Sequence, residues 1–111
     1  AIPIKQFKRK NNFLFEKYYY LDKNDQIKEI YKKSSKKNKD LINSFKTLNN
    51  LKFIEFPKLG LEELNKIVKK ISIRNGCLLL IDYGYLFPKN QSTLQSVMKH
   101  KKNNLLNNLG K

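Results

Sequence analysis

The first apolar pattern along the chain is that of a β-hairpin. Residues Phe13–Leu21 are rich in aromatic side chains, contain no Gly or Pro, and divide between two faces at a period of two. The turn-forming stretch Asp22–Asp25 follows, and Gln26–Tyr31 returns as the second strand. Aromatic residues at this density usually pack within a hairpin; stacking on nucleic-acid bases is the alternative. The first strand has two faces: Phe13, Phe15, Lys17, Tyr19 and Leu21 on one, and Leu14, Glu16, Tyr18 and Tyr20 on the other.

A polar segment and a short helix are predicted next. Residues Lys32–Asp40 hold five lysines and no apolar side chain, which is typical of a solvated loop. Leu41, Phe45 and Leu48 recur at the spacing i, i+4, i+7. This spacing predicts a short helix, and Asp40 is well placed to be its N-cap.

An α/β pattern fills the centre of the chain. Residues Leu51–Phe56 alternate and stop at Pro57, which predicts a short strand near the edge of a sheet. An amphipathic helix follows, ends at Asn75–Gly76, and leads into the wholly apolar run Cys77–Ile81. Such a run is typical of a strand that is covered on both faces in a parallel sheet. The helix carries one apolar stripe: Leu61, Leu64, Ile67, Val68 and Ile71.

Charge is the most unusual feature of the composition. The chain has 111 residues and a formal net charge of +15, and its cations are almost all Lys, with Arg only at Arg9 and Arg74. Lys-rich surfaces bind phosphate, whereas base-specific contacts favour Arg. A general excess of Lys, Asn, Ile, Phe and Tyr is also what an AT-rich genome produces. Compositional bias is therefore favoured over a non-specific anionic partner, and a specific nucleic-acid site is the least favoured interpretation.

Several classes of protein are excluded by length and composition. The length leaves room for one small domain, and the longest apolar run, Cys77–Ile81, is far shorter than a membrane span. There is no secretory signal pattern. A single cysteine excludes an internal disulfide and fits a reducing compartment, and Cys77 with His100 offers too few ligands for a structural zinc.

The best candidate site that the pattern itself offers is a carboxylate. Asp82 comes directly after the apolar run, and ligands of open α/β sheets bind beyond the carboxyl ends of the strands. An N-cap or turn role is the alternative for Asp82. His100 stands between lysines, where a solvent-exposed histidine is commoner than a catalytic base. The sequence contains no Gly-rich phosphate loop, paired-carboxylate motif or Ser/His/Asp order.

Three stretches, in order, resemble one family. Ala1–Phe7 looks like the second half of an Asn-Glu-x-x-Asp-Ala-x-Pro-x-x-Gln-Phe motif, and Gly76–Gly84 looks like Gly-Gly-x-x-Leu-x-x-Asp-Tyr-Gly. Thr93–Gln95, followed by His100 and Gly110, looks like Thr-x-(Gln/Arg)-x-x-x-x-His…Pro-Gly. The family is that of the MidA-type S-adenosylmethionine-dependent methyltransferases, whose mitochondrial members assemble respiratory complex I by methylating an arginine of a core subunit.

The resemblance implies a fold and a position within it. Residues 13–22 sit where the family has a hairpin, and Phe53–Phe56 sits where it has a Val-Glu-Val-like strand. Asn75 replaces the first of two paired glycines, and Leu109 replaces the proline before Gly110. The resemblance therefore implies that residues 1–111 are a single partial domain with the later strands of a Rossmann-like α/β sheet and an inserted hairpin. On this view the cofactor-binding loop lies upstream, and the chain alone is inactive.

The resemblance also assigns roles to residues. Asp82 would pair with the substrate cation or hold its own loop, and His100 would accept a proton or contact substrate, so these two form the implied catalytic set. The loop with Pro3 and Gln6 would follow the fourth strand, beside the reacting methyl. The implied substrate-binding residues are Pro3, Gln6, Tyr83, Gly84 and Gln95.

The implied cofactor is S-adenosylmethionine, with no metal. The implied partner is a protein substrate, such as a subunit of respiratory complex I, in the bacterial cytoplasm or the mitochondrial matrix. No specific nucleic acid is expected. Two alternatives stay open: a small basic RNA-binding or ribosome-associated module, and an inactive gene remnant. The paired motifs Ala1–Phe7 and Gly76–Gly84 separate the methyltransferase from the RNA-binding module, because a phosphate-binding surface requires neither motif.

Overall fold

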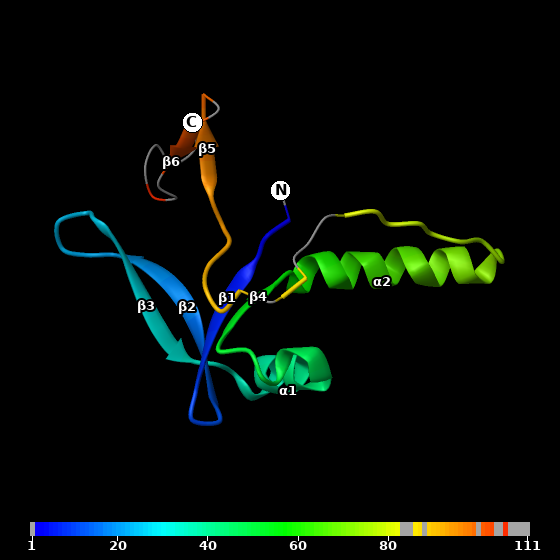
Figure 1. Ribbon diagram of the computed structural model, residues 1–111, viewed down its shortest axis with the longest axis horizontal. Helices are drawn as coiled ribbons and strands as arrows, with labels where there is room; N and C mark the ends of the chain where they lie inside the picture. The colour runs from blue at the N-terminus through cyan, green and yellow to red at the C-terminus, as the bar shows by residue number, and fades with distance from the viewer. Residues whose placement is uncertain (1, 83–85, 88, 100, 104–105, 107–111) are drawn as a thin grey trace.

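A four-stranded antiparallel sheet forms the centre of the molecule (Figure 1). The computed structural model describes residues 2–82, 86–87, 89–99, 101–103 and 106. Four strands pair in the order β3-β2-β1-β4, so the mixed α/β class is confirmed and this sheet is antiparallel throughout. Its strands are β1 (Lys5–Lys10), β2 (Phe13–Leu21), β3 (Ile27–Lys33) and β4 (Phe53–Phe56).

The predicted β2–β3 hairpin is confirmed, and a second hairpin joins β1 to β2. Asn11 and Asn12 form the β1–β2 turn with φ of 46° and 58°, the left-handed values that a tight two-residue hairpin turn requires. At the other turn, Asp22 Oδ1 accepts backbone hydrogen bonds from Asn24 and Gln26, both at 2.9 Å. The short polar side chains of Asn and Asp therefore set both turns.

The prediction of a solvated loop over residues 32–40 is wrong. Strand β3 runs on to Lys33, and helix α1 (Lys36–Ser44) begins inside the lysine-rich segment. Ser35, rather than Asp40, is the N-cap, and its hydroxyl accepts a hydrogen bond from the backbone N–H of Asn38 at 3.2 Å. Most of the lysines project into solvent, while Ile42 is fully buried against the sheet and Leu41 packs beside it, so two apolar residues hold a helix that looks polar in sequence.

The edge strand and the amphipathic helix are both confirmed. Strand β4 lies at one edge of the sheet, and helix α2 (Lys58–Ile73) follows it after Pro57. The helix ends as predicted, because Asn75 adopts a left-handed φ of 52° just before Gly76. None of its residues is fully buried, and Figure 1 shows α2 extending away from the sheet. A 3₁₀ turn, Lys46–Leu48, connects α1 to the stretch before β4.

The predicted buried strand at Cys77–Ile81 is wrong for this structure. These residues have no strand pairing, and Leu79 and Ile81 are 79% and 87% exposed. Residues 77–82 run back along α2 instead (Figure 1). A strand exists only by pairing with a neighbour, and no described strand lies beside this run. The apolar pattern therefore marks a segment with strand chemistry but no partner strand among the described residues.

A small hairpin near the C-terminus carried no clear signal in the sequence. Strands β5 (Ser96–Met98) and β6 (Lys101–Asn103) pair antiparallel as a separate two-stranded sheet. Lys99, in the turn between them, has a φ of 50°. Among the described residues, no helix combines the length and the apolar character that crossing a membrane requires.

The core occupies one face of the sheet, beneath α1. Glu16 is also buried there at 2% exposure, and it is ion-paired with Lys5 and hydrogen-bonded by Asn38 at 3.0 Å. A buried carboxylate requires such partners, since an unpaired charge in an apolar interior is strongly unfavourable. The opposite face of the sheet is therefore the one available for other contacts. The apolar core consists of Phe7, Leu14, Ile42, Ile54 and Phe56.

We expect Ile42→Ala to lower the free energy of unfolding by about 2–5 kcal/mol, because it leaves a cavity between α1 and the sheet. Ile73→Ala is the matched control: Ile73 is 83% exposed at the end of α2, so the change should stay within about 0.5 kcal/mol. Urea unfolding followed by circular dichroism measures both. Equal losses in the two variants would contradict the assignment of Ile42 as the anchor of α1.

Candidate functional site

The carboxylate of Glu55 joins two segments that are far apart in the sequence. Its Oε1 accepts hydrogen bonds from Gln6 Nε2 at 2.9 Å, from the backbone N–H of Thr93 at 3.0 Å and from that of Leu94 at 3.3 Å. Ser92 Oγ donates to the same oxygen at 3.4 Å, and Thr93 Oγ1 donates to Oε2. We call this set, Gln6, Glu55, Ser92, Thr93 and Leu94, the Glu55 cluster.

Strand register explains why Gln6 and Glu55 meet. Gln6 lies directly opposite Glu55 in the antiparallel β1–β4 pair, so both side chains emerge on the same face of the sheet. Gln6 is 4% exposed, and its amide also donates to Ser92 Oγ at 2.8 Å. The buried amide of Gln6 is therefore bound by partners from both segments. Nearby, Asn90 Oδ1 accepts from the backbone N–H of Lys52 at 2.9 Å and fixes the same returning segment.

The cluster keeps Glu55 ionised. Burial raises the pKa of the Glu55 carboxyl, but hydrogen bonds from Thr93, Gln6 and the backbone N–H groups of Thr93 and Leu94 lower it more. The resulting pKa lies below the usual value of 4.5. A carboxylate that is ionised at neutral pH and already surrounded by donors is a poor proton acceptor. Its chemical role here is to hold residues 92–94 against β4.

An apolar pocket with a volume of about 500 Å³ lies beside the N-terminal segment, and pockets of this size suit a small ligand or a single side chain. It brings Pro3 of the first motif together with Leu80 of the second, although the two lie far apart in sequence. Glu63 is the acidic residue in its lining, and it pairs with Lys66 at 2.6 Å. The other lining residues are Ile2, Pro57, Leu59, Gly60, Leu61, Leu64 and Ile67.

The structure places the predicted site residues in two neighbouring groups. Pro3 lines the apolar pocket, and Gln6 belongs to the Glu55 cluster. Their Cα atoms are at most about 11 Å apart, because the two residues are only three positions apart in the chain. The expectation that Gln6 lies in a loop is wrong: it is in strand β1. Asp82 lies two residues after Leu80, so its Cα is within about 7 Å of the Cα of that pocket residue.

Gln95 lies at a different pocket from Pro3. It lines a more polar cavity of about 550 Å³, together with Glu29 of β3 and Lys102 and Asn103 of β6. The neighbouring Thr93 contributes to this lining and to the Glu55 cluster. Residues 92–94 therefore connect Gln95 to the cluster that contains Gln6. The remaining predicted residues, Tyr83, Gly84 and His100, lie outside the residues that the structure describes.

Glu55 is the organising residue that the sequence analysis did not select. Two signals pointed to it: it is the charged member of an alternating apolar strand, and it matches the Glu of the Val-Glu-Val-like strand in the resembling family. A single exposed-looking glutamate in an edge strand is common, however, so its partners became evident only from the β1–β4 register. No group of His, Cys, Asp and Glu side chains suited to a metal ion occurs among the described residues.

Comparison with known protein families gives one match. A family model described as "Putative S-adenosyl-L-methionine-dependent methyltransferase" matches residues 1–111. The searches of curated proteins and of solved structures found no match. The match covers the motif segments Ala1–Phe7, Gly76–Gly84 and Thr93–Gln95.

The hydrogen bonds that residues 92–94 donate to Glu55 clamp this segment to β4, and we expect this clamp to be lost as pH falls. Because the pKa of Glu55 is lower in the folded state than its usual value of 4.5, its stabilising effect is complete above that value. It disappears as pH falls through the lowered pKa. Hydrogen-exchange protection factors of the Thr93 and Leu94 amides should drop in this range, and Glu55→Gln should lower them already at neutral pH. In the control Glu62→Gln, on exposed α2, protection should equal that of the wild type; a drop there, or none in Glu55→Gln, would contradict the clamp.

Proposed function

The chain belongs to this family of S-adenosyl-L-methionine-dependent methyltransferases, and we propose that it forms the acceptor-binding side of an enzyme that methylates a protein arginine. One observation carries the proposal: the pocket that joins Pro3 to Leu80 is apolar and has Glu63 in its lining. The family match supports neither of the two alternatives to a methyltransferase, which are the small RNA-binding module and the inactive remnant.

The pocket fits the chemistry of an arginine side chain. Its apolar walls suit the methylene stem, and a carboxylate suits the planar guanidinium, which it can bind through two parallel hydrogen bonds. The guanidinium stays charged at all physiological pH values, so its positive charge must be held on the side away from the nitrogen that reacts, and the proton that this nitrogen loses on methylation passes to solvent. We assign that task to Glu63 and to Asp82, which follows Leu80 closely along the chain.

The Glu55 cluster acts by positioning. It fixes Gln6 in strand β1, and thereby the short segment that leads back to Pro3 at the pocket. It also holds Thr93 and Leu94, next to Gln95. Alignment within an ångström matters for a transfer that depends on geometry more than on acid–base chemistry. Gln6 is therefore assigned as a positioning residue and Gln95 as a residue on the substrate side. Pro3 is assigned to the wall of the pocket.

The described residues do not form a site for the methyl donor. Binding an adenosyl cofactor in this class of fold uses a glycine-rich turn between a strand and a helix. The described glycines are isolated: Gly60 lies within α2, and Gly76 follows its C-terminal end. The pocket at Pro3 is apolar and offers no cluster of polar donors for a ribose or an amino acid. The role proposed for this chain is therefore confined to the acceptor.

The exposed apolar run at residues 77–81 supports a Rossmann-like sheet in the enzyme. Contiguous exposed apolar side chains on a soluble domain mark a surface that another element covers. The uniform pattern of this run is that of a strand buried on both faces. In the structure the run is unpaired and lies along α2, with Leu80 in the lining of the acceptor pocket. We therefore propose the Rossmann-like sheet for the enzyme as a whole, with this run as a surface that its other elements cover.

The acceptor protein and the compartment are extrapolated from the resemblance to the MidA-type family. On that basis the acceptor is an arginine of a respiratory complex I subunit. The corresponding location is the bacterial cytoplasm or, in a eukaryote, the mitochondrial matrix. The single cysteine, Cys77, is compatible with a reducing compartment.

We expect Asp82→Asn and Glu63→Gln, made in the full-length protein, each to reduce methyl transfer to an arginine peptide by about tenfold or more. Either change removes a charge that holds the guanidinium. The measurement is incorporation of labelled methyl from S-adenosylmethionine into arginine peptides, with lysine peptides in parallel. Glu62→Gln is the matched control, because Glu62 is the neighbour of Glu63 on α2 and does not line the pocket.

Two outcomes would count against the assignment. Activity of Asp82→Asn within a few-fold of wild type would remove Asp82 from the mechanism. A preference of the wild-type enzyme for lysine peptides would exclude arginine as the acceptor, while leaving the methyltransferase family unaffected.

A further inference from the structure

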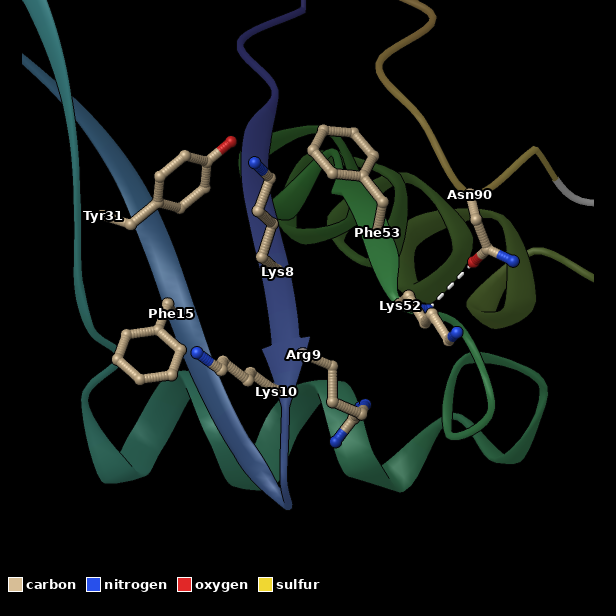
Figure 2. Close-up of a pocket in the computed structure, with 8 residues that line it drawn as sticks. All are labelled: Lys8, Arg9, Lys10, Phe15, Tyr31, Lys52, Phe53 and Asn90. Atoms are coloured by element: carbon tan, nitrogen blue, oxygen red, sulfur yellow. Dashed lines mark hydrogen bonds between the residues drawn. The ribbon is translucent and has the colours of Figure 1, made fainter.

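A second, chemically different surface lies on the open face of the sheet. It is a cavity of about 560 Å³ over β1, β2, β3 and the start of β4, on the side away from α1 (Figure 2). We call it the lysine–aromatic face and define it by Lys8, Lys10, Phe15, Tyr31, Lys52 and Phe53. From it we infer that this protein binds single-stranded nucleic acid without sequence preference, in addition to its proposed methyltransferase function.

Strand register builds the lysine–aromatic face. Lys8 of β1 lies opposite Phe15 of β2 and opposite Phe53 of β4. Phe53 is only 8% exposed, so the partly exposed Phe15 and Tyr31 supply the accessible rings beside this cation. The Lys8 ammonium lies 4.4 Å from the centre of the Tyr31 ring, a cation–π contact. Figure 2 shows the Lys8 and Tyr31 side chains directed toward each other over the strands.

The positive charge of this surface favours an anionic ligand. None of its lining residues is acidic, whereas Lys8, Lys10 and Lys52 are cationic. Arg9 also contributes to the lining, but its guanidinium donates to Asn43 Oδ1 on the α1 side, at 3.1 and 3.2 Å. The basic surface ends at the ion pair Lys17–Glu29, where the charge is balanced. Before that boundary, the Lys33 ammonium lies 4.6 Å from the Phe13 ring centre and extends the pattern.

Lysines interleaved with aromatic rings match single-stranded nucleic acid better than an acidic peptide. Phosphates are neutralised by the lysines, and each unpaired base has a face that stacks on an aromatic ring. An acidic peptide would use the lysines but has no need of the rings. Arginine is the side chain that most often recognises base edges, and the guanidinium of Arg9 is bound to Asn43 on the α1 side. Binding should therefore tolerate any nucleotide sequence.

The test is fluorescence anisotropy of a labelled 12-nucleotide oligouridylate with the full-length protein at several salt concentrations. We expect the double variant Lys8→Gln/Lys10→Gln to weaken binding about tenfold or more and to reduce the salt slope by about 1.4. The matched control is Lys36→Gln/Lys37→Gln, which removes the same charge from exposed α1, on the other side of the sheet. Its affinity should fall less than about threefold.

The rings are tested separately from the charges. Tyr31→Leu should weaken binding about fivefold, whereas Tyr31→Phe, which keeps the ring, should bind like the wild type. Tyr20→Leu is the control, since Tyr20 is exposed on the opposite face of the same hairpin. Circular dichroism melting curves verify that each variant folds.

Three results would overturn the inference. The first is no binding of the oligonucleotide by the wild-type protein. The second is an equal loss in the two double-lysine variants, which would show attraction by net charge alone. The third is a glutamate-rich peptide that binds more tightly than the oligonucleotide through Lys8 and Lys10, which would make the partner an acidic protein segment. Loss of methyl transfer in the Asp82 and Glu63 variants is independent of all three.

Discussion

The register between β1 and β4 is the constraint on which the rest of the structure depends. It sets Gln6 opposite Glu55 and Lys8 opposite Phe53 on one face, and Phe7 opposite Ile54 on the other. Because side chains alternate along a strand, a slip of one residue would move Phe7 out of the core and bury lysines. The same pairing therefore determines the core, the Glu55 cluster and the lysine–aromatic face.

The two faces of the sheet differ in the side chains they carry and in what packs on them. One face packs on Ile42 of α1 and contains the apolar core, together with the paired carboxylate of Glu16. The other face has no helix over it among the described elements, and it holds hydrogen-bonding and cationic side chains. A sheet with one buried and one solvated face is the usual antiparallel arrangement. Here the second face is only partly solvated, because Gln6 and Phe53 are buried on it, and it carries both the clamp for residues 92–94 and the basic surface.

Where prediction from sequence succeeded, the signal was local. Alternation identified β2, turn residues identified its hairpin, and a helical stripe with Asn75–Gly76 identified α2 and its end. A helix was predicted near α1, but its start was placed at Asp40 because the first residues of α1 are lysine-rich and its apolar residues, Leu41 and Ile42, lie near its C-terminal end. Residues 77–81 were assigned as a buried strand because their composition is apolar, but composition does not supply a pairing strand.

The sequence by itself determined the chemistry that is available: turn-forming Asn and Asp, an edge strand that contains Glu55, lysines beside aromatic rings, and motifs that place the chain in a methyltransferase family. Only the tertiary structure decided which of these groups meet. Glu55 reaches Gln6 and Thr93 through strand pairing and the path of the returning chain, and Pro3 reaches Leu80 in the same way. The physical reason is that local patterns report the preferences of neighbours in sequence, whereas these contacts join residues that only pairing and packing bring together.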